Sequence, residues 1–165
     1  MEALQTRTLT SAKALLEEVV QHTLESLFFV EAVPIDGREA ARIDGTEGLE
    51  VMIVIKGAFS GEIFMSLSRE SACRLISQTL NVAGEVTNEL LADAFAETLN
   101  TIGGRVAAAL ARANETFDLS IPTVTFGKLA ASGQAPVKCC FQVEYGRICF
   151  SIFIGTLTPS LRGAP

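Results

Sequence analysis

The fold is decided by residues 49–67, which read LEVMIVIKGAFSGEIFMSL. The first half of this stretch is rich in Val, Ile and Met, which predicts a strand, and residues 62–67 are interpreted as the strand that returns from it. Ser60-Gly61 separates the halves. We therefore expect a β-hairpin of two strands, at 49–59 and 62–67.

Helices are expected on both sides of this hairpin. Ser68 is a typical N-cap and Glu70 lies in the first turn of a helix that ends near Leu80. A second, longer helix follows at about 88–113. Before the hairpin, residues 11–29 carry apolar side chains at helical spacing, namely Leu15, Val19, Val20, Leu24, Leu27 and Phe28.

Further strands are expected outside the hairpin and helices. Residues 119–126 form one strand, and 137–145 and 147–155 form a second hairpin. A weaker pattern predicts a strand at 38–43, after a break in the chain at Pro34.

The order of these elements predicts the α+β fold class. At roughly 150 residues per domain, a chain of 165 residues is one domain. We expect a single domain over 1–165 with an antiparallel-rich β-sheet and about three helices packed on it. Its core spans about residues 10–156, and residues 157–165 are expected to be a flexible tail.

Composition and charge exclude several classes of protein. The chain is 48% apolar and 19% charged, which excludes a disordered chain. Its net charge of −6 argues against nucleic-acid and anionic-lipid partners. No apolar run approaches the roughly 20 residues of a spanning helix, and residues 1–4 lack the features of a signal peptide. We therefore expect a cytoplasmic protein with no membrane partner.

The cysteines do not form a metal-binding pattern. The chain has four of them but no Cys-x-x-Cys, and His22 is its one histidine. Adjacent residues of a strand point to opposite faces, so Cys139 and Cys140 cannot chelate an ion together. We expect no metal site and four buried, reduced thiols, the other two being Cys73 and Cys149.

The long helix carries polar residues on the side opposite its apolar stripe. Asn100, Gly103 and Gly104 lie in the middle of this helix. Asn is a mediocre helix former, and each Gly lowers helix stability by about 1 kcal/mol relative to Ala. Their presence there disfavours the simpler interpretation of a solvated surface. Gly103 and Gly104 also leave room for another backbone to approach. Four residues fall within about 60° on this polar side, namely Asp93, Glu97, Asn100 and Gly104.

These side chains have limited chemistry on their own. The sequence shows no nucleophile with a neighbouring base. A carboxamide such as that of Asn100 can orient a water molecule, and a carboxylate such as that of Glu97 can bind a cation on a partner. Phosphoryl transfer needs mainly positioning and charge stabilisation, so two such side chains suffice when the partner brings the remaining groups.

The spacing of these residues resembles a known signature. Asp93-x3-Glu97-x2-Asn100, followed downstream by Ile121-Pro122, is similar to the motif of the CheC/CheX/FliY chemotaxis phosphatases, and the chain most resembles the CheX members. Residues 56–68, 100–104 and 120–127 resemble further segments of that family. The resemblance covers about residues 10–156.

The resemblance implies a function and a role for each motif position. The family dephosphorylates the response regulator CheY, with Asn100 then directing the attacking water and Glu97 pairing with the lysine of the receiver domain. The receiver supplies Mg²⁺, so the chain is expected to need no cofactor or metal of its own. The remaining positions are expected to shape the motif or contact the partner, namely Asp93, Gly103, Gly104 and Pro122.

Two positions depart from the family pattern. The spacing from Asn100 to Pro122 is one residue shorter, and Arg105 replaces a polar Asn of many relatives, which would alter partner contact. A second motif on the first helix is not expected, because that helix offers only Glu18-x-x-Gln21. The chain is thus expected to have one active centre.

The resemblance also implies a homodimer, and it leaves two alternative functions open. CheX-type relatives pair through their sheets, and the strands after Pro136 are expected to supply the edge. One alternative is a non-catalytic docking module that binds a receiver or a flagellar-switch partner. The other is an unrelated domain that binds a small molecule. The residues expected along the dimer edge are Phe141, Tyr145, Cys149 and Phe150.

Overall fold

The computed structural model describes residues 2–35, 43, 46–57, 60–111, 113–129 and 137–155. The expected tail at 157–165 lies outside these residues, as does the expected strand at 38–43 apart from Ile43. The helices are α1 (Glu2–Phe28), α3 (Arg69–Leu80) and α4 (Asn88–Leu110), and the strands are β1 (Val33–Ile35), β2 (Glu47–Gly57), β3 (Ser60–Ser68), β4 (Phe117–Leu119), β5 (Thr123–Lys128), β6 (Val137–Val143) and β7 (Gly146–Gly155).

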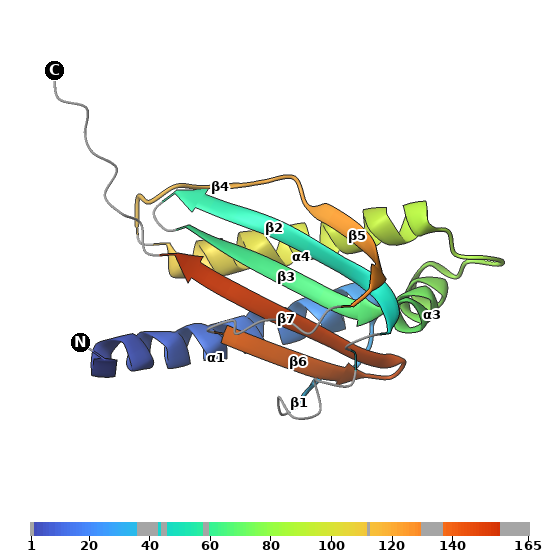
Figure 1. The fold of residues 1–165 in the computed structure, drawn as a ribbon, viewed down its shortest axis with the longest axis horizontal. Helices are drawn as coiled ribbons and strands as arrows, with labels where there is room; N and C mark the ends of the chain where they lie inside the picture. Colours follow the sequence, from blue (N-terminus) through green and yellow to red (C-terminus); the bar gives the residue numbers. More distant parts are fainter. Residues whose placement is uncertain are drawn as a thin grey trace, which may run out of the picture.

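The strands form one seven-stranded sheet in which every pairing is antiparallel (Figure 1). Their order is β1-β6-β7-β3-β2-β4, and β5 pairs with β2 next to β4. Helices α1 and α4 cross the same face of the sheet, and α3 lies at one end (Figure 1). The predicted α+β class is confirmed.

The β2–β3 hairpin is present, but its turn is displaced from the expected one. The pairs Val51–Met65 and Ile55–Gly61 fix its register. Ser60 and Gly61 lie inside β3, where they also pair with β7, so they do not form the turn. Turn-type residues inside a strand were misread as the turn itself.

Pro34 does not break the chain as expected. It lies in β1, opposite Phe141 of β6. A proline has no N–H to donate, and it is tolerated here because β1 is an edge strand of the sheet.

The second hairpin is confirmed as β6 and β7, but it is not a free edge. Strand β1 covers one side of it and β3 the other. Phe141 and Phe150 are 0% and 1% exposed and contact each other edge to face, with ring centroids 6.2 Å apart. The expectation that these two residues line a dimer edge is therefore wrong, since both belong to the core.

The helices are fixed by apolar contacts with the sheet and with one another. The rings of Phe28 in α1 and Phe95 in α4 stack with centroids 5.6 Å apart. Ser68 caps α3 as predicted, because its Oγ accepts a hydrogen bond of 3.1 Å from the N–H of Ser71. Leu27, expected on the apolar stripe of α1, is instead 36% exposed. None of the helices, over the residues described, is long and apolar enough to cross a membrane.

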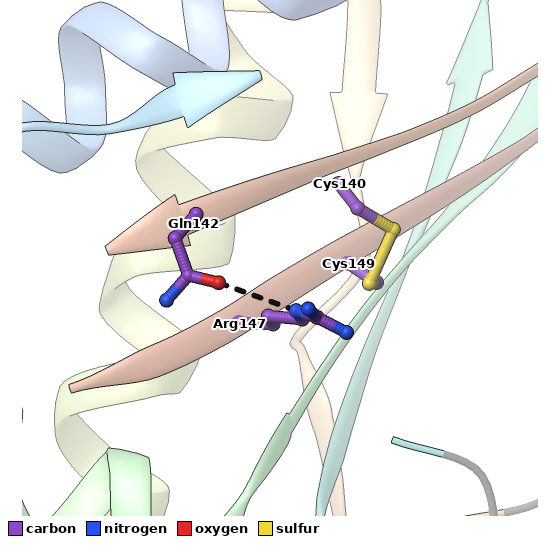
Figure 2. The surroundings of a disulfide bond; sticks show 4 residues. All are labelled: Cys140, Gln142, Arg147 and Cys149. Atoms are coloured by element: carbon purple, nitrogen blue, oxygen red, sulfur yellow. Dashed lines mark hydrogen bonds between the residues drawn. A yellow bond between two sulfur atoms is a disulfide. The ribbon is translucent and has the colours of Figure 1, made fainter. Parts of the chain in front are cut away.

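Two of the four cysteines are joined, which corrects the expectation of reduced thiols. Cys140 and Cys149 are directly opposite in β6 and β7 and form a disulfide with a Cα–Cα distance of 4.1 Å (Figure 2). Cys73 and Cys139 are free thiols. Burial raises the pKa of Cys139 to about 12, so that this thiol stays protonated and unreactive.

The disulfide is part of a brace near the β6–β7 turn. Arg147 Nε donates a hydrogen bond of 3.2 Å to Gln142 Oε1, across the strands and two residue pairs from the disulfide (Figure 2). Gln142 Nε2 in turn donates to the carbonyl oxygens of Val143 and Gly146, both at 2.9 Å. The hairpin is thus fixed on the sheet face that α1 and α4 do not cover.

Reduction of this disulfide is expected to lower the free energy of unfolding by about 2–3 kcal/mol, because a cross-link restricts the unfolded chain. Urea unfolding with and without a dithiol reductant measures the difference. The double variant Cys140→Ser/Cys149→Ser is the control and should not respond to the reductant. An equal response of wild type and double variant would assign the effect to other cysteines.

Candidate functional site

The candidate site is one face of α4, whose direction is fixed by capping and by burial of the opposite face. Thr87 caps the helix, with its Oγ1 accepting a hydrogen bond of 3.2 Å from the N–H of Leu90. Five apolar side chains of the buried face are at most 2% exposed, namely Leu91, Phe95, Leu99, Ile102 and Val106. The polar face therefore points away from the core along a rigid helix.

The predicted acid and amide side chains lie together on this outward face. Asp93 and Glu97 are exposed, and Asn100 is half-buried. Residues three and four apart on a helix are neighbours, so Glu97 lies beside both of the others. No hydrogen bond or ion pair joins these three side chains to another residue that the structure describes. They are thus available to a partner.

The two glycines of the motif have different surroundings. Gly103 is buried, and a Cβ there would lie 3.4 Å from Ile53 Cδ1 and Cγ2 on β2 and 3.7 Å from Leu119 Cδ2. Side chains of the protein's own sheet, and not another backbone, therefore pack against Gly103. Gly104 is half-buried, and a Cβ there would meet only Leu119 Cδ1, at 3.8 Å. Packing leaves room for a methyl group at Gly104.

Gly104→Ala is expected to raise the free energy of unfolding by about 0.5–1 kcal/mol, because alanine favours the helix and the added methyl has space. Urea unfolding measures the change. Gly103→Ala is the matched control, and its gain should be smaller because the new methyl presses on Ile53. A loss of stability in Gly104→Ala would mean that the fold itself requires this glycine.

Arg105 has a role within the fold that the sequence did not reveal. Its Nη1 donates a hydrogen bond of 2.8 Å to Oγ1 of Thr23, which is fully buried in α1. At 100° per residue, Arg105 lies about 140° around the helix from Asn100. The guanidinium therefore joins α4 to α1 on the side away from β4.

The segment that carries Pro122 differs from the single strand expected at 119–126. It consists of β4 and β5, with residues 120–122 between them. Ser120 is fixed to Val54 of β2 twice, by its N–H to the carbonyl oxygen and by its Oγ accepting from the N–H, both at 2.9 Å. Pro122 is half-buried, and Ile121 is 90% exposed.

Metal-binding groups do not gather in the part of the chain that the structure describes. No three His, Cys, Asp or Glu side chains lie close enough there to hold an ion. His22 is exposed on α1.

Comparison with known proteins gives one family. The family model described as "Chemotaxis phosphatase CheX" matches residues 49–144, which is more than half of the chain. This range contains α4 and the whole of residues 120–122. No curated protein matches the sequence.

Several solved structures share the fold at low sequence identity. The chemotaxis protein CheX from Vibrio vulnificus has a TM-score of 0.72 and 19% identity, over 87% of this chain and 96% of that one. A CheX from Desulfovibrio desulfuricans has a TM-score of 0.70 and 16% identity, over 88% and 99%. A structure of the CheX-CheY-BeF₃-Mg²⁺ complex from Borrelia burgdorferi has a TM-score of 0.66 and 17% identity, over 87% and 97%.

Proposed function

Because the chain belongs to the CheX family of chemotaxis phosphatases, we propose that it accelerates hydrolysis of the aspartyl phosphate of a CheY-type receiver domain. The observation that supports this most directly is the outward face of α4. There Glu97 and Asn100 lie one turn apart, without an internal partner among the described residues, on a helix whose other face is packed into the core. Such a helix can hold two side chains in a fixed geometry.

Asn100 is proposed to position the water that attacks the phosphorus atom. Its carboxamide oxygen accepts a hydrogen bond from the water and aligns it opposite the aspartyl oxygen. The water oxygen forms a bond to phosphorus and the bond from phosphorus to the aspartyl oxygen breaks, which releases inorganic phosphate and the carboxylate. Fixing a water in line removes much of the entropy cost of the step.

Glu97 is proposed to set the register of the complex. Its exposed carboxylate pairs with the ammonium group of a lysine in the receiver's active site, which places Asn100 beside the phosphate. Asp93 lies one turn before Glu97 on the same face and adds negative charge there. The Mg²⁺ that neutralises phosphate charge in this reaction is proposed to come from the receiver.

We further propose that the protein is a cytoplasmic homodimer that pairs through its sheet. On the sheet face away from α1 and α4, Phe64 of β3 and Phe153 of β7 contact each other edge to face, with centroids 5.6 Å apart. Both are only partly buried, as is Met52 of β2. A second copy would cover these apolar side chains.

The experiment that tests the function follows the decay of a phosphorylated CheY-type receiver in Mg²⁺, with and without the protein. We expect a substoichiometric amount of protein to accelerate phosphate release. Binding to the receiver without acceleration would instead support the docking-module alternative. Neither binding nor acceleration with several receivers would contradict the proposed function.

A further inference from the structure

Ile121 presents an apolar side chain to solvent in the segment between β4 and β5. At 90% it has the highest exposure of any large hydrophobic residue described. Single exposed apolar residues are common, so exposure alone does not indicate a role. Whether Ile121 has a role therefore depends on the residues around it.

The segment holds Ile121 outward by a β-bulge. Leu119 pairs with Ile55 and Thr123 pairs with Met52, so three residues of this edge face only two of β2. The extra residue bends the edge strand outward. Ser120, fixed twice to β2, precedes Ile121, and Pro122, with its restricted φ, follows it. The exposed isoleucine is thus held on both sides.

The bulge lies beside Asn100. Of the β4–β5 edge, the side chain of Leu119 comes nearest to both Gly103 and Gly104. Viewed down the axis of α4, Asn100 points in a direction between those of the two glycines. Helix α4 starts near β5 and ends near β4, so it runs opposite to the edge (Figure 1). The two residues from Leu119 to Ile121 advance the strand by about 6.6 Å. Four residues of helix, from Gly104 back to Asn100, cover about the same length. Ile121 therefore lies level with Asn100.

We infer that Ile121 is a docking residue for the receiver domain, which it contacts through an apolar surface next to the acyl phosphate. The inference rests on the proposed function, because the receiver is the occupant that the neighbouring site requires. Glu97 and Asp93 offer negative charge to its lysine from the turns of α4 before Asn100, and Ile121 offers apolar area level with Asn100 on the neighbouring edge of the sheet. Gly104, one turn after Asn100, has no side chain to block the partner's approach to this face.

The test compares Ile121→Ala and Ile121→Asp with wild type in two assays. One measures the Kd for a receiver held in its Mg²⁺ and beryllofluoride form, and the other measures KM and kcat for decay of the phosphorylated receiver. Burial of an isoleucine corresponds to roughly 10- to 100-fold in affinity. We expect Kd and KM to rise by about tenfold or more in Ile121→Ala, and further in Ile121→Asp, with kcat unchanged.

The matched control is Val33→Ala. Val33 is also an apolar residue of an edge strand and is 47% exposed, but β1 lies at the other end of the strand order. Its Kd and KM should equal those of wild type. Urea unfolding of the Ile121 variants should also match wild type, since the side chain is in solvent.

The two assays separate this inference from the proposed function. If wild type binds the beryllofluoride receiver but does not accelerate decay, a weaker Kd in Ile121→Asp supports docking while the phosphatase proposal fails. If wild type accelerates decay and both Ile121 variants keep its Kd and KM, the docking role is refuted and the function stands. Failure of wild type to bind or act on any receiver overturns both.

Discussion

Asn100→Ala is expected to reduce the acceleration of receiver dephosphorylation by about 100-fold or more, the effect of losing a well-oriented reacting group. The carboxamide is proposed to do nothing except orient the water, so kcat should carry the loss. The Kd for the beryllofluoride receiver should stay within a few fold. Single-turnover decay of a phosphorylated receiver, at saturating protein, measures the change directly.

The chain supplies a matched control for this variant. Glu85 and Asn88 have the same spacing as Glu97 and Asn100, but Glu85 lies before α4 and Asn88 is its first residue. Asn88 Oδ1 accepts a hydrogen bond of 2.8 Å from Arg69 Nη2. Asn88→Ala removes a carboxamide from the same helix and should leave kcat unchanged. If Asn100→Ala retained the wild-type kcat, the water-positioning role would be wrong.

Most of the fold was readable from local patterns. Strand-type runs separated by short breaks in residues 49–67 and 137–155 predicted two hairpins, and the capping residue Ser68 predicted the start of α3. These patterns depend only on residues that are close in sequence, so they can be recognised without knowing the order of the strands in the sheet. The exact ends did not follow, since α4 stops at Leu110 rather than near residue 113 and α1 begins at Glu2 rather than near Ser11.

The misreadings share a tertiary cause. Pro34 signals a break unless the strand that contains it is an edge, and edge status depends on strand order. The Cys140–Cys149 bond could have been found, because in a hairpin that turns between Val143 and Gly146 these two positions are directly opposite. What was missing was the register, which requires the turn to be placed correctly.

The polar residues of the candidate site were easier to predict from the sequence than the strands that surround them. Helical spacing alone placed Asp93, Glu97 and Asn100 on one face, and the structure has all three facing outward. The sequence could not show that Gly103 packs on β2, nor that the bulge beside β4 leaves Ile121 exposed. Both depend on how the sheet packs against the helix, which no local pattern encodes.

Glu97→Lys is expected to lower kcat/KM for receiver dephosphorylation by about 100-fold or more. The carboxylate of Glu97 is proposed to pair with a lysine of the receiver, and the variant places a like charge opposite that lysine. Leaving a charge in an interface unpaired costs about 2–5 kcal/mol of binding free energy. Glu97→Gln, which keeps the shape and loses the charge, should have an intermediate effect. Rising salt should weaken wild-type binding more than that of Glu97→Gln.

The control for the charge reversal is Glu85→Lys. Glu85 is also exposed and lies just before α4, so this variant changes the net charge equally without altering the polar face. It should change kcat/KM by no more than about twofold, the scale of a screened surface charge. An equal loss in both variants would mean that the receiver responds to overall charge. A loss confined to Glu97 would locate the lysine contact at the middle of α4, one turn from the amide that positions the water.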